Sequence, residues 1–285
     1  MYDGIFGGLT LTGTLYLCAT PIGNLEDMTF RAIRILREVD VIAAEDTRRT
    51  RKLLTHFDIH TPLIRFDENC SATVGEKILL RLQAGESVAV VSDAGLPAIS
   101  DPGADLVRLA IDAGIAICPI PGANAALSAL ICSGLDTSKF LFVGFAPKSK
   151  KNRREFLQRL ATVEATLIFY EAPHRLKNFL TEAAEVFGSR QAVLARELTK
   201  VHEEFLRGNL LELSEKISEP RGEFVLVVEG ATQSQIVTPA EDVSSVVEKF
   251  LSEGLDKKSA MRETAKIFNV SRREIYNALI REEES

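Results

Sequence analysis

Short apolar runs alternate with segments of helical periodicity along the first 130 residues, and this alternation constrains the fold more than any other feature. Strand-like runs occupy 14–19, 41–44, 88–91 and 115–120. Helical spacing of apolar residues predicts helices over 29–39, 74–83 and 105–113. Strands that alternate with helices predict βαβ units and a mostly parallel sheet. The run VAVV at 88–91 has no polar position, as is typical of a parallel strand buried on both faces.

The next hundred residues predict a second α/β lobe with a mixed sheet. After an expected helix at 125–131, strand-like runs follow at 140–143, 166–170, 192–195, 204–207 and 223–228. These runs lie closer together than those of the first lobe, which favours some antiparallel pairing. We therefore expect a Gly-rich flexible N-terminus at 1–13, an N-terminal α/β lobe at 14–122 and a C-terminal α/β lobe at 123–232.

A third, helical unit is expected at the C-terminal end. The segment 233–237 is mostly polar and is typical of a linker, and Thr238-Pro239-Ala240-Glu241 has the pattern of a helix start. Helices are expected over about 241–252, 257–268 and 271–280. The segment 238–285 is thus predicted to be a three-helix module with helix-turn-helix character.

Composition and charge exclude several classes of protein. With 46% hydrophobic and 26% charged residues, the 285-residue chain is typical of soluble globular proteins. A net charge of −6 argues against binding nucleic acid over the whole surface but allows local basic patches. The four cysteines form no CxxC pair, so we expect neither a zinc site nor disulfides, as is usual in the cytoplasm. We expect no signal peptide, no membrane span and no metal.

Three turns at the expected strand ends carry small residues and prolines: 20–24, 92–103 and 121–124. Ligands of open α/β sheets bind at the carboxyl ends of the strands, and small residues let the backbone approach a ligand closely. Glycine and proline also occur in ordinary loops, but three such turns at one edge favour a binding site. The sequence has no G-x-G-x-x-G or Walker A motif, so an ordinary dinucleotide or NTP site is not expected.

Six segments together resemble one known family. They are ATPIGNLEDMTFRA (19–32), AEDTRRTRKLL (44–54), SDAGLPAISDPG (92–103), PIPGANAAL (119–127), FYEAPHR (169–175) and ARELTK (195–200). The chain from 14 to about 230 resembles the tetrapyrrole-methylase superfamily and, within it, the 2′-O-ribose methyltransferases of small-subunit ribosomal RNA. The resemblance implies a two-lobed class III methyltransferase fold that binds S-adenosylmethionine between its lobes. It also implies a cytoplasmic homodimer that acts on a cytidine of 16S ribosomal RNA, near the decoding site of the small ribosomal subunit.

The same resemblance implies the cofactor-binding residues. They are Pro21, Ile22 and Gly23, facing the cofactor and substrate; Asp93, Ala94, Gly95, Leu96 and Ile99, along the methionine and ribose; Gly122, Ala123 and Asn124; and Tyr170 and Arg196, over the adenine. Tetrapyrrole enzymes usually have Gly-Asp-Pro in the second motif. This chain has Gly95-Leu96-Pro97 instead, with the acid earlier at Asp93. The departure favours the RNA branch and leaves the role of Asp93 open.

Two basic clusters are candidates for RNA contacts. One consists of Arg48, Arg49, Arg51 and Lys52, and the other of Lys148, Lys150, Lys151, Arg153 and Arg154. Lys and Arg side chains can hold phosphates without reading sequence. We expect the second cluster to form a flexible loop over a cleft. The alternatives are a solvated helix face for the first cluster and, for the second, an exposed loop that is kept soluble by its charge.

Methyl transfer to a ribose hydroxyl needs an in-line approach and an acceptor for the hydroxyl proton. Glu171, or Lys200 with a lowered pKa, are the candidate catalytic residues. His174 follows the same strand, but a lone His beside proline is more often structural. Two alternative functions stay open: a methyltransferase acting on a corrin-like ring, and a non-catalytic RNA-binding protein.

Overall fold

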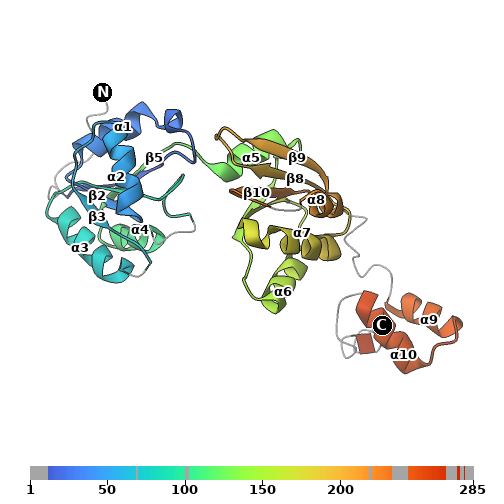
Figure 1. Ribbon diagram of the computed structural model, residues 1–285. Coiled ribbons are helices and arrows are strands. Elements are labelled where there is room, and N and C mark those ends of the chain that lie inside the picture. The colour runs from blue at the N-terminus through green and yellow to red at the C-terminus, as the bar shows by residue number, and fades with distance from the viewer. Residues whose placement is uncertain are drawn as a thin grey trace.

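The computed structural model describes residues 12–68, 70–99, 103–217, 220–232 and 243–267, with 275, 276 and 279. Figure 1 shows two α/β lobes side by side and a small helical unit beyond the second lobe. Each lobe is built on a five-stranded sheet, and the α/β class predicted from the sequence is confirmed. No helix in the described part of the chain is long and apolar enough to cross a bilayer.

The first sheet has the strand order β3-β2-β4-β1-β5, and all its pairs are parallel. Its strands are β1 (Thr14–Cys18), β2 (Val41–Ala44), β3 (Leu63–Arg65), β4 (Val88–Val91) and β5 (Ala116–Ile120). The predicted parallel sheet is therefore confirmed. The sequence analysis missed β3 because it has three residues, follows a proline and lies at the sheet edge.

Helices cover both faces of the first sheet. They are α1 (Phe30–Glu38), α2 (Thr47–His56), α3 (Ser71–Gln83) and α4 (Gly103–Asp112), with a 3-10 turn η1 at Leu25–Asp27. Alternate residues of β2 pack on opposite faces: Ile42 joins a cluster with α1 and α2, and Ala43 joins a cluster with α3 and α4. Burial on both faces explains why β2 and β4 are apolar at every position.

The second sheet has the order β6-β7-β10-β8-β9 and is mixed, as predicted. Its strands are β6 (Phe140–Phe145), β7 (Thr166–Glu171), β8 (Gln191–Arg196), β9 (Glu204–Asn209) and β10 (Phe224–Val228). The β6–β7 pair is parallel, and β10 runs antiparallel to both β7 and β8. The amino end of β10 therefore lies beside the carboxyl ends of β7 and β8.

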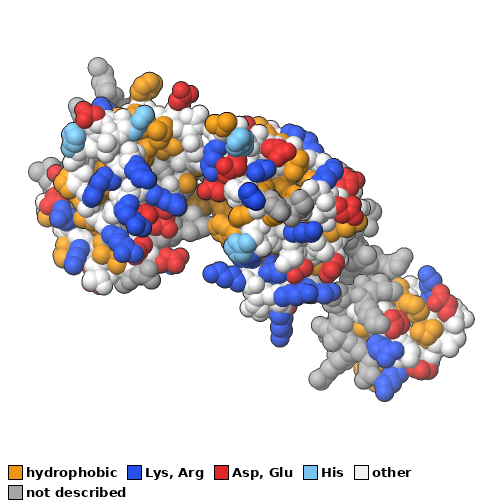
Figure 2. Space-filling model, in the orientation of Figure 1, with side chains coloured by type: hydrophobic (Ala, Val, Ile, Leu, Met, Phe, Trp, Pro, Cys, Tyr) orange, Lys and Arg blue, Asp and Glu red, His pale blue; other side chains and the backbone are white. Residues whose placement is uncertain are grey.

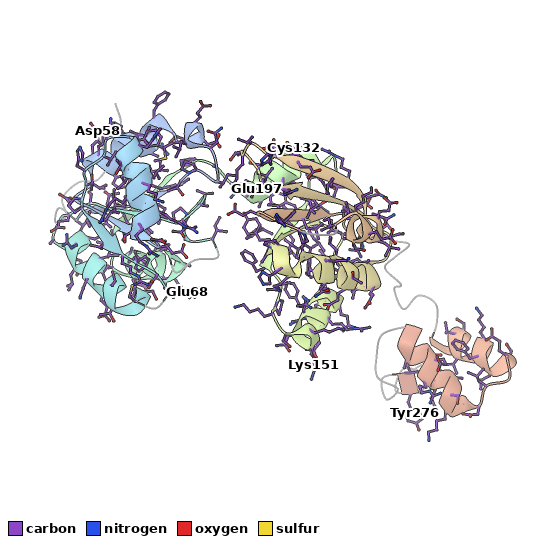
Figure 3. All side chains as sticks on the ribbon, viewed as in Figure 1. Asp58, Glu68, Cys132, Lys151, Glu197 and Tyr276 are labelled. Carbon is purple, nitrogen blue, oxygen red and sulfur yellow. The ribbon has the colours of Figure 1, made fainter. Side chains whose placement is uncertain are left out.

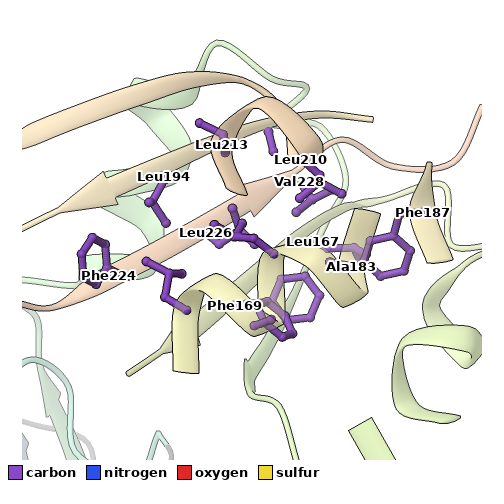
Figure 4. Packing of buried hydrophobic residues seen from close by; sticks show 14 of the residues in the cluster. Leu167, Phe169, Ala183, Phe187, Leu194, Leu210, Leu213, Phe224, Leu226 and Val228 are labelled. Atoms are coloured by element: carbon purple, nitrogen blue, oxygen red, sulfur yellow. The ribbon is translucent and has the colours of Figure 1, made fainter. Parts of the chain in front are cut away.

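Helices also cover both faces of the second sheet. One face packs on α6 (Lys150–Leu160), α7 (Pro173–Phe187) and α8 (Leu210–Lys216) in the core drawn in Figure 4, where Phe169 and Leu226 are fully buried. The other face packs on α5 (Ala125–Ser133) and also on Ile22, which comes from the first lobe. The predicted flexible loop at 148–154 is wrong, because α6 begins at Lys150.

The ends of the chain are described in part. Gly13 is buried and its amide donates to the Leu82 carbonyl, so the predicted flexible N-terminus does not extend to it; residues 1–11 lie outside the described part. In the tail, α9 (Val243–Ser252) and α10 (Lys257–Ile267) pack around Val247 and Ala260. Most of the expected third helix and the linker at 233–237 lie outside the described residues, so the helix-turn-helix module stays a prediction.

We expect Gly230→Ala to destabilise the fold. A Cβ there would lie 1.9 Å from the Glu164 carbonyl oxygen, and the backbone of both segments would have to move. Such overpacking costs about 1–3 kcal/mol, measurable as a lower urea midpoint. Gly75→Ala in α3 is the matched control, because its Cβ would meet nothing closer than 3.7 Å. Equal midpoints for the two variants would contradict the expectation.

Candidate functional site

A pocket of about 460 Å³ lies between the two lobes and is called the interlobe pocket below. The first lobe contributes Ile22, Glu45, Arg49, Ser92, Asp93, Ala94, Gly95, Leu96 and Ile99, and Asn124 and Ala125 follow where the chain passes into the second lobe. The second lobe contributes Phe145, Tyr170, Glu171, Ala172, Pro173, Leu198, Gly222, Glu223, Phe224 and Val225. The structure thus brings residues of all three predicted turns, those after β1, β4 and β5, to one cavity.

Backbone hydrogen bonds tie the turns after β1 and β4 together. The Thr20 amide donates to the Gly95 carbonyl at 2.9 Å, and the Gly95 amide donates back to the Thr20 carbonyl at 3.1 Å. The Thr20 hydroxyl adds a bond to the Ser92 carbonyl at 3.2 Å. Gly95 has a φ of +82°, which an L side chain rarely adopts, and a Cβ there would lie 3.4 Å from Ile22. Glycine at this position fixes the shape of the pocket wall.

Asp93 connects this wall to α2. Its Oδ1 accepts the backbone amide of Asp46 at 3.1 Å, and its Oδ2 lies 3.2 Å from the Arg49 guanidinium. Asp46 in turn caps α2 by accepting the Arg48 amide at 2.8 Å. The open question about Asp93 therefore has a structural answer: it fixes the start of α2 and orients Arg49 at the pocket.

Aromatic rings form part of the wall from the second lobe. The Tyr170 ring makes edge contacts with Phe142 at 5.0 Å and with Phe145 at 5.7 Å between centroids. Burial raises the pKa of Tyr170, and a hydrogen bond from the Ala126 backbone partly offsets the rise. Phe145 remains 57% exposed, although it is a large apolar side chain. Such a ring offers a flat apolar face to a planar ligand.

Glu171 is the buried acid of the interlobe pocket. Its Oε1 accepts the Ala172 amide at 2.9 Å and lies 3.3 Å from the Arg175 guanidinium. Its Oε2 is buried without a hydrogen-bond partner among the described residues. Burial raises the pKa of Glu171, and the Ala172 amide and Arg175 only partly offset the rise. The structure therefore places a carboxyl group with free acceptor capacity at the pocket.

Lys200 does not match the base that the sequence analysis proposed. Its Nζ donates to Glu197 Oε1 at 2.9 Å and to Glu223 Oε2 at 3.1 Å. Burial alone would lower the pKa of Lys200, but these hydrogen bonds outweigh it and leave the pKa raised. The prediction that Lys200 has a lowered pKa was therefore wrong, because a lysine held between two carboxylates keeps its proton. Glu197, labelled in Figure 3, lies on the side of the second lobe that faces the first.

The other predicted cofactor residues lie around the pocket. Pro21 and Gly23 line a neighbouring groove of about 320 Å³. Gly122 and Ala123 do not line the pocket; a Cβ at Gly122 would lie 2.8 Å from the Ala19 Cβ, so the glycine allows close packing there. Asn124 lines the pocket and caps α5, where its Oδ1 accepts the Leu127 amide at 2.9 Å.

Arg196 is also outside the lining of the interlobe pocket. Its Nε donates to the Arg221 carbonyl at 3.0 Å, and its guanidinium lies 3.5 Å from Glu204. These contacts hold Arg196 beside the segment that precedes β10, and its expected contact with the adenine stays a prediction.

The sequence analysis missed Glu45, Phe145, Leu198 and the 222–225 segment. It searched the carboxyl ends of strands, whereas 222–225 lies at the amino end of β10. The antiparallel pairing of β10 brings that end to the site. Phe145 did have a signal, because it ends an apolar run before Ala146-Pro147.

The two basic clusters differ in what they can contact. Arg49 lines both the pocket and the neighbouring groove, while Arg48 and Arg51 are exposed on α2. Figure 2 shows Lys and Arg side chains gathered over α2 on this face of the first lobe. In the second cluster, the exposed side chains are Lys148, Lys150, Lys151 and Arg154. Figure 3 places Lys151 on α6, at the end of the second lobe.

Arg153 is the exception in the second cluster. It is buried, donates to both carboxylate oxygens of Glu182 at 2.7 Å, and donates to the Lys148 carbonyl at 3.1 Å. The hydrogen bonds from Arg153 lower the pKa of Glu182. The predicted RNA contact at Arg153 is therefore wrong, because its guanidinium is already bonded within the second lobe.

Breaking this ion pair should destabilise the second lobe. We expect Arg153→Met to cost about 3 kcal/mol near neutral pH, because the mostly buried carboxylate of Glu182 would lose its partner. The loss should shrink as the pH falls through the pKa of Glu182, where its proton replaces the lost cation. The double variant R153M/E182M should recover most of the stability in chemical denaturation. A double variant no more stable than R153M would contradict this account.

Comparison with known proteins places the chain in one family. Residues 14–214 match the family described as tetrapyrrole (corrin/porphyrin) methylases. A protein of Halalkalibacterium halodurans named ribosomal RNA small subunit methyltransferase I is 52% identical over 93% of this chain and 94% of its own length. A protein of the same name from Bacillus subtilis is 47% identical over 96% of each chain.

Solved structures agree at the level of the fold. Uroporphyrin-III C-methyltransferase from Thermus thermophilus, crystallised with S-adenyl homocysteine, has a TM-score of 0.56 at 18% identity and covers 76% of this chain and 97% of its own. The methyltransferase CobJ has a TM-score of 0.59 at 20% identity, with coverage of 77% and 95%. Together with the match over 14–214, these findings show that the chain belongs to the tetrapyrrole (corrin/porphyrin) methylase family.

Proposed function

We propose that the chain is an S-adenosylmethionine-dependent methyltransferase of ribosomal RNA, which methylates the 2′-oxygen of a cytidine in 16S RNA near the decoding site. The observation that carries the proposal is the interlobe pocket, built from strand-end turns of both lobes. The names of the relatives that are 52% and 47% identical support ribosomal RNA as the substrate.

The residues of the interlobe pocket fit S-adenosylmethionine. Its volume lies in the usual range of ligand pockets, roughly 300–1,000 Å³. Among its described lining residues, Arg49 is the one cation and faces four carboxylates, those of Glu45, Asp93, Glu171 and Glu223. An anionic pocket favours a ligand with a sulfonium and an ammonium group. The unpartnered Oε2 of Glu171 adds an acceptor for such a ligand or for a hydroxyl.

When bound, S-adenosylmethionine supplies a methyl group on a positively charged sulfur, which leaves as a neutral thioether. The chain contributes positioning and proton transfer. Gly95 lets the backbone approach the ligand, and the rings of Tyr170 and Phe145 offer an apolar wall. Glu171 is the proposed acceptor of the proton that the ribose hydroxyl loses as its oxygen gains the methyl group.

A corrin-like substrate is the alternative enzyme function. Proteins with uroporphyrin or cobalt-precorrin in their names share this fold, but at 16–21% identity. The relatives named for ribosomal RNA are 45–52% identical over nearly the whole chain. The closer likeness favours RNA. The non-catalytic alternative, an RNA-binding protein, is tested by the assay below.

RNA binding and assembly are part of the proposal. Phosphates of the small ribosomal subunit, in the cytoplasm, would be held by Arg48, Arg49 and Arg51 on α2 and by Lys148, Lys150, Lys151 and Arg154 near α6.

The proposed homodimer surface consists of exposed apolar side chains, Leu127 and Ile131 of α5 and Phe140 and Leu141 of β6. Exposed apolar groups of this kind are typical of protein interfaces.

The methylation assay tests the function directly. Small ribosomal subunits from a strain that lacks this protein, incubated with the chain and methyl-labelled S-adenosylmethionine, should yield label in a ribose-methylated cytidine of 16S RNA. Cofactor binding without any label in the RNA would contradict the proposal. Label recovered in a tetrapyrrole instead would support the alternative enzyme.

A pair of glycine variants tests the assigned pocket. Gly95 and Gly134 have similar left-handed backbones, with φ of +82° and +79°, so alanine strains both alike. At Gly95 the added Cβ would also occupy space on the pocket wall, in contact with the Ala123 carbonyl and Ile22 at 3.4 Å, whereas at Gly134 it meets nothing within 4 Å. We expect G95A to weaken S-adenosylmethionine binding about tenfold or more in calorimetry, with G134A near wild type. Equal affinities of G95A and G134A for S-adenosylmethionine would show that the cofactor does not bind in the interlobe pocket.

The raised pKa of Glu171 predicts the pH dependence of methylation. The carboxyl must lose its proton to act as a base, so kcat should rise with pH through a pKa above that of ordinary glutamate. Glu171→Gln should remove this rise and lower kcat by about 10²–10⁴-fold. Glu185→Gln, an exposed change on α7, is the control. An E171Q enzyme that binds the cofactor and keeps the same pH rise would exclude Glu171 as the base.

A further inference from the structure

The groove beside the interlobe pocket, called the side groove below, is a second cavity at the same border between the lobes. Its volume is about 320 Å³, and it lies over the turn after β1 and the first turns of α2. Ile22, Ser92 and Ala94 line both cavities, so the two meet along one shared wall. A molecule in the side groove would therefore reach the ligand of the interlobe pocket at that wall.

The two cavities have opposite charge. Among the described lining residues of the side groove, three cations, Arg49, Lys52 and Lys200, outnumber the two carboxylates of Asp93 and Glu223. In the interlobe pocket the carboxylates outnumber the cations. The whole chain has a net charge of −6, so the positive lining of the side groove is a local feature. Such a lining favours an anion next to the proposed site of the cationic cofactor.

Lys52 supplies the charge that is not neutralised within this groove. Arg49 lies 3.2 Å from Asp93, and Lys200 is bonded to Glu223. Lys52 is exposed, and it forms no ion pair with any residue in the described part of the chain. It follows Arg49 by three positions on α2, so both side chains lie on the same helix face, toward the groove.

We propose that the side groove holds the ribose-phosphate of the nucleotide to be methylated, with a phosphate on Lys52 and Arg49 and the 2′-hydroxyl at the shared wall. The proposal rests on the proposed function and assigns the substrate side of that site. Lys and Arg bind any nucleotide's phosphate equally, so the groove positions the backbone and leaves base recognition to other contacts. Gly23, which lines the groove, keeps it open where a Cβ would collide with Lys200 at 2.6 Å.

The test compares Lys52→Gln with Lys52→Arg and with Lys77→Gln, an exposed lysine of α3 away from the groove. Methyl transfer to small ribosomal subunits is measured over a range of salt concentrations, and S-adenosylmethionine affinity is measured separately. We expect K52Q to raise KM for the subunits roughly three- to tenfold and to reduce the slope of log affinity against log salt by about 0.7–0.9. K52R should keep a KM for the subunits and a salt slope close to those of wild type, and K77Q should match wild type in both quantities. The affinity for S-adenosylmethionine should be the same in all variants.

The outcomes separate this inference from the proposed function. If wild type transfers no methyl group to ribosomal RNA, the proposed function fails. If wild type is active and K52Q has the same KM and salt slope, the side groove does not hold a phosphate and the inference is overturned. A K52Q variant with weaker cofactor affinity and unchanged salt slope would also overturn it, because Lys52 would then belong to the cofactor site.

Discussion

The reciprocal backbone bridge between Thr20 and Gly95 is the interaction on which the site depends. It joins the turns after β1 and β4, whose strands are neighbours in the parallel sheet. Asp93, within the second of these turns, then holds the start of α2 and the guanidinium of Arg49. One short stretch of backbone thus sets the wall of the interlobe pocket and the position of the basic helix. Side chains far apart in sequence have fixed places because their loops share hydrogen bonds.

The interlobe pocket and the side groove differ in the sign of their net charge, although they share one wall. Carboxylates outnumber cations in the pocket proposed for a cationic methyl donor, and cations outnumber carboxylates in the groove proposed for an anionic backbone. The negative interlobe pocket would attract the methyl donor and disfavour the RNA backbone. The positive side groove would do the opposite. Lys200 belongs to this arrangement as a fixed cation, since Glu197 and Glu223 keep it protonated. Its contribution is electrostatic and structural, and proton transfer falls to Glu171.

The sequence predicted the sheets well because their strands carry the burial pattern in their own residues: β4 is apolar throughout, and it is buried on both faces. It could not predict what depends on distant partners. Arg153 has the same local signal as its basic neighbours, and its ion pair with Glu182, 29 positions away, distinguishes it from them. The pKa of Lys200 depends likewise on Glu223, and the role of 222–225 depends on the direction of β10. Local sequence patterns thus predict helices and strands, whereas the burial and the pKa of a charged side chain depend on neighbours that are distant in the sequence.

Ile22 shows that the two lobes are separate sheets but not separate folding cores. It lies in the turn after β1, yet its side chain is buried in the cluster formed by α5 and the second sheet, beside Leu198 and Val225. The first lobe thereby supplies part of the apolar cover of the second. A fragment that starts after residue 122 would expose that surface to water, which favours aggregation. A foreign domain in place of the first lobe would leave this cluster uncovered unless it brought an apolar side chain to the position of Ile22.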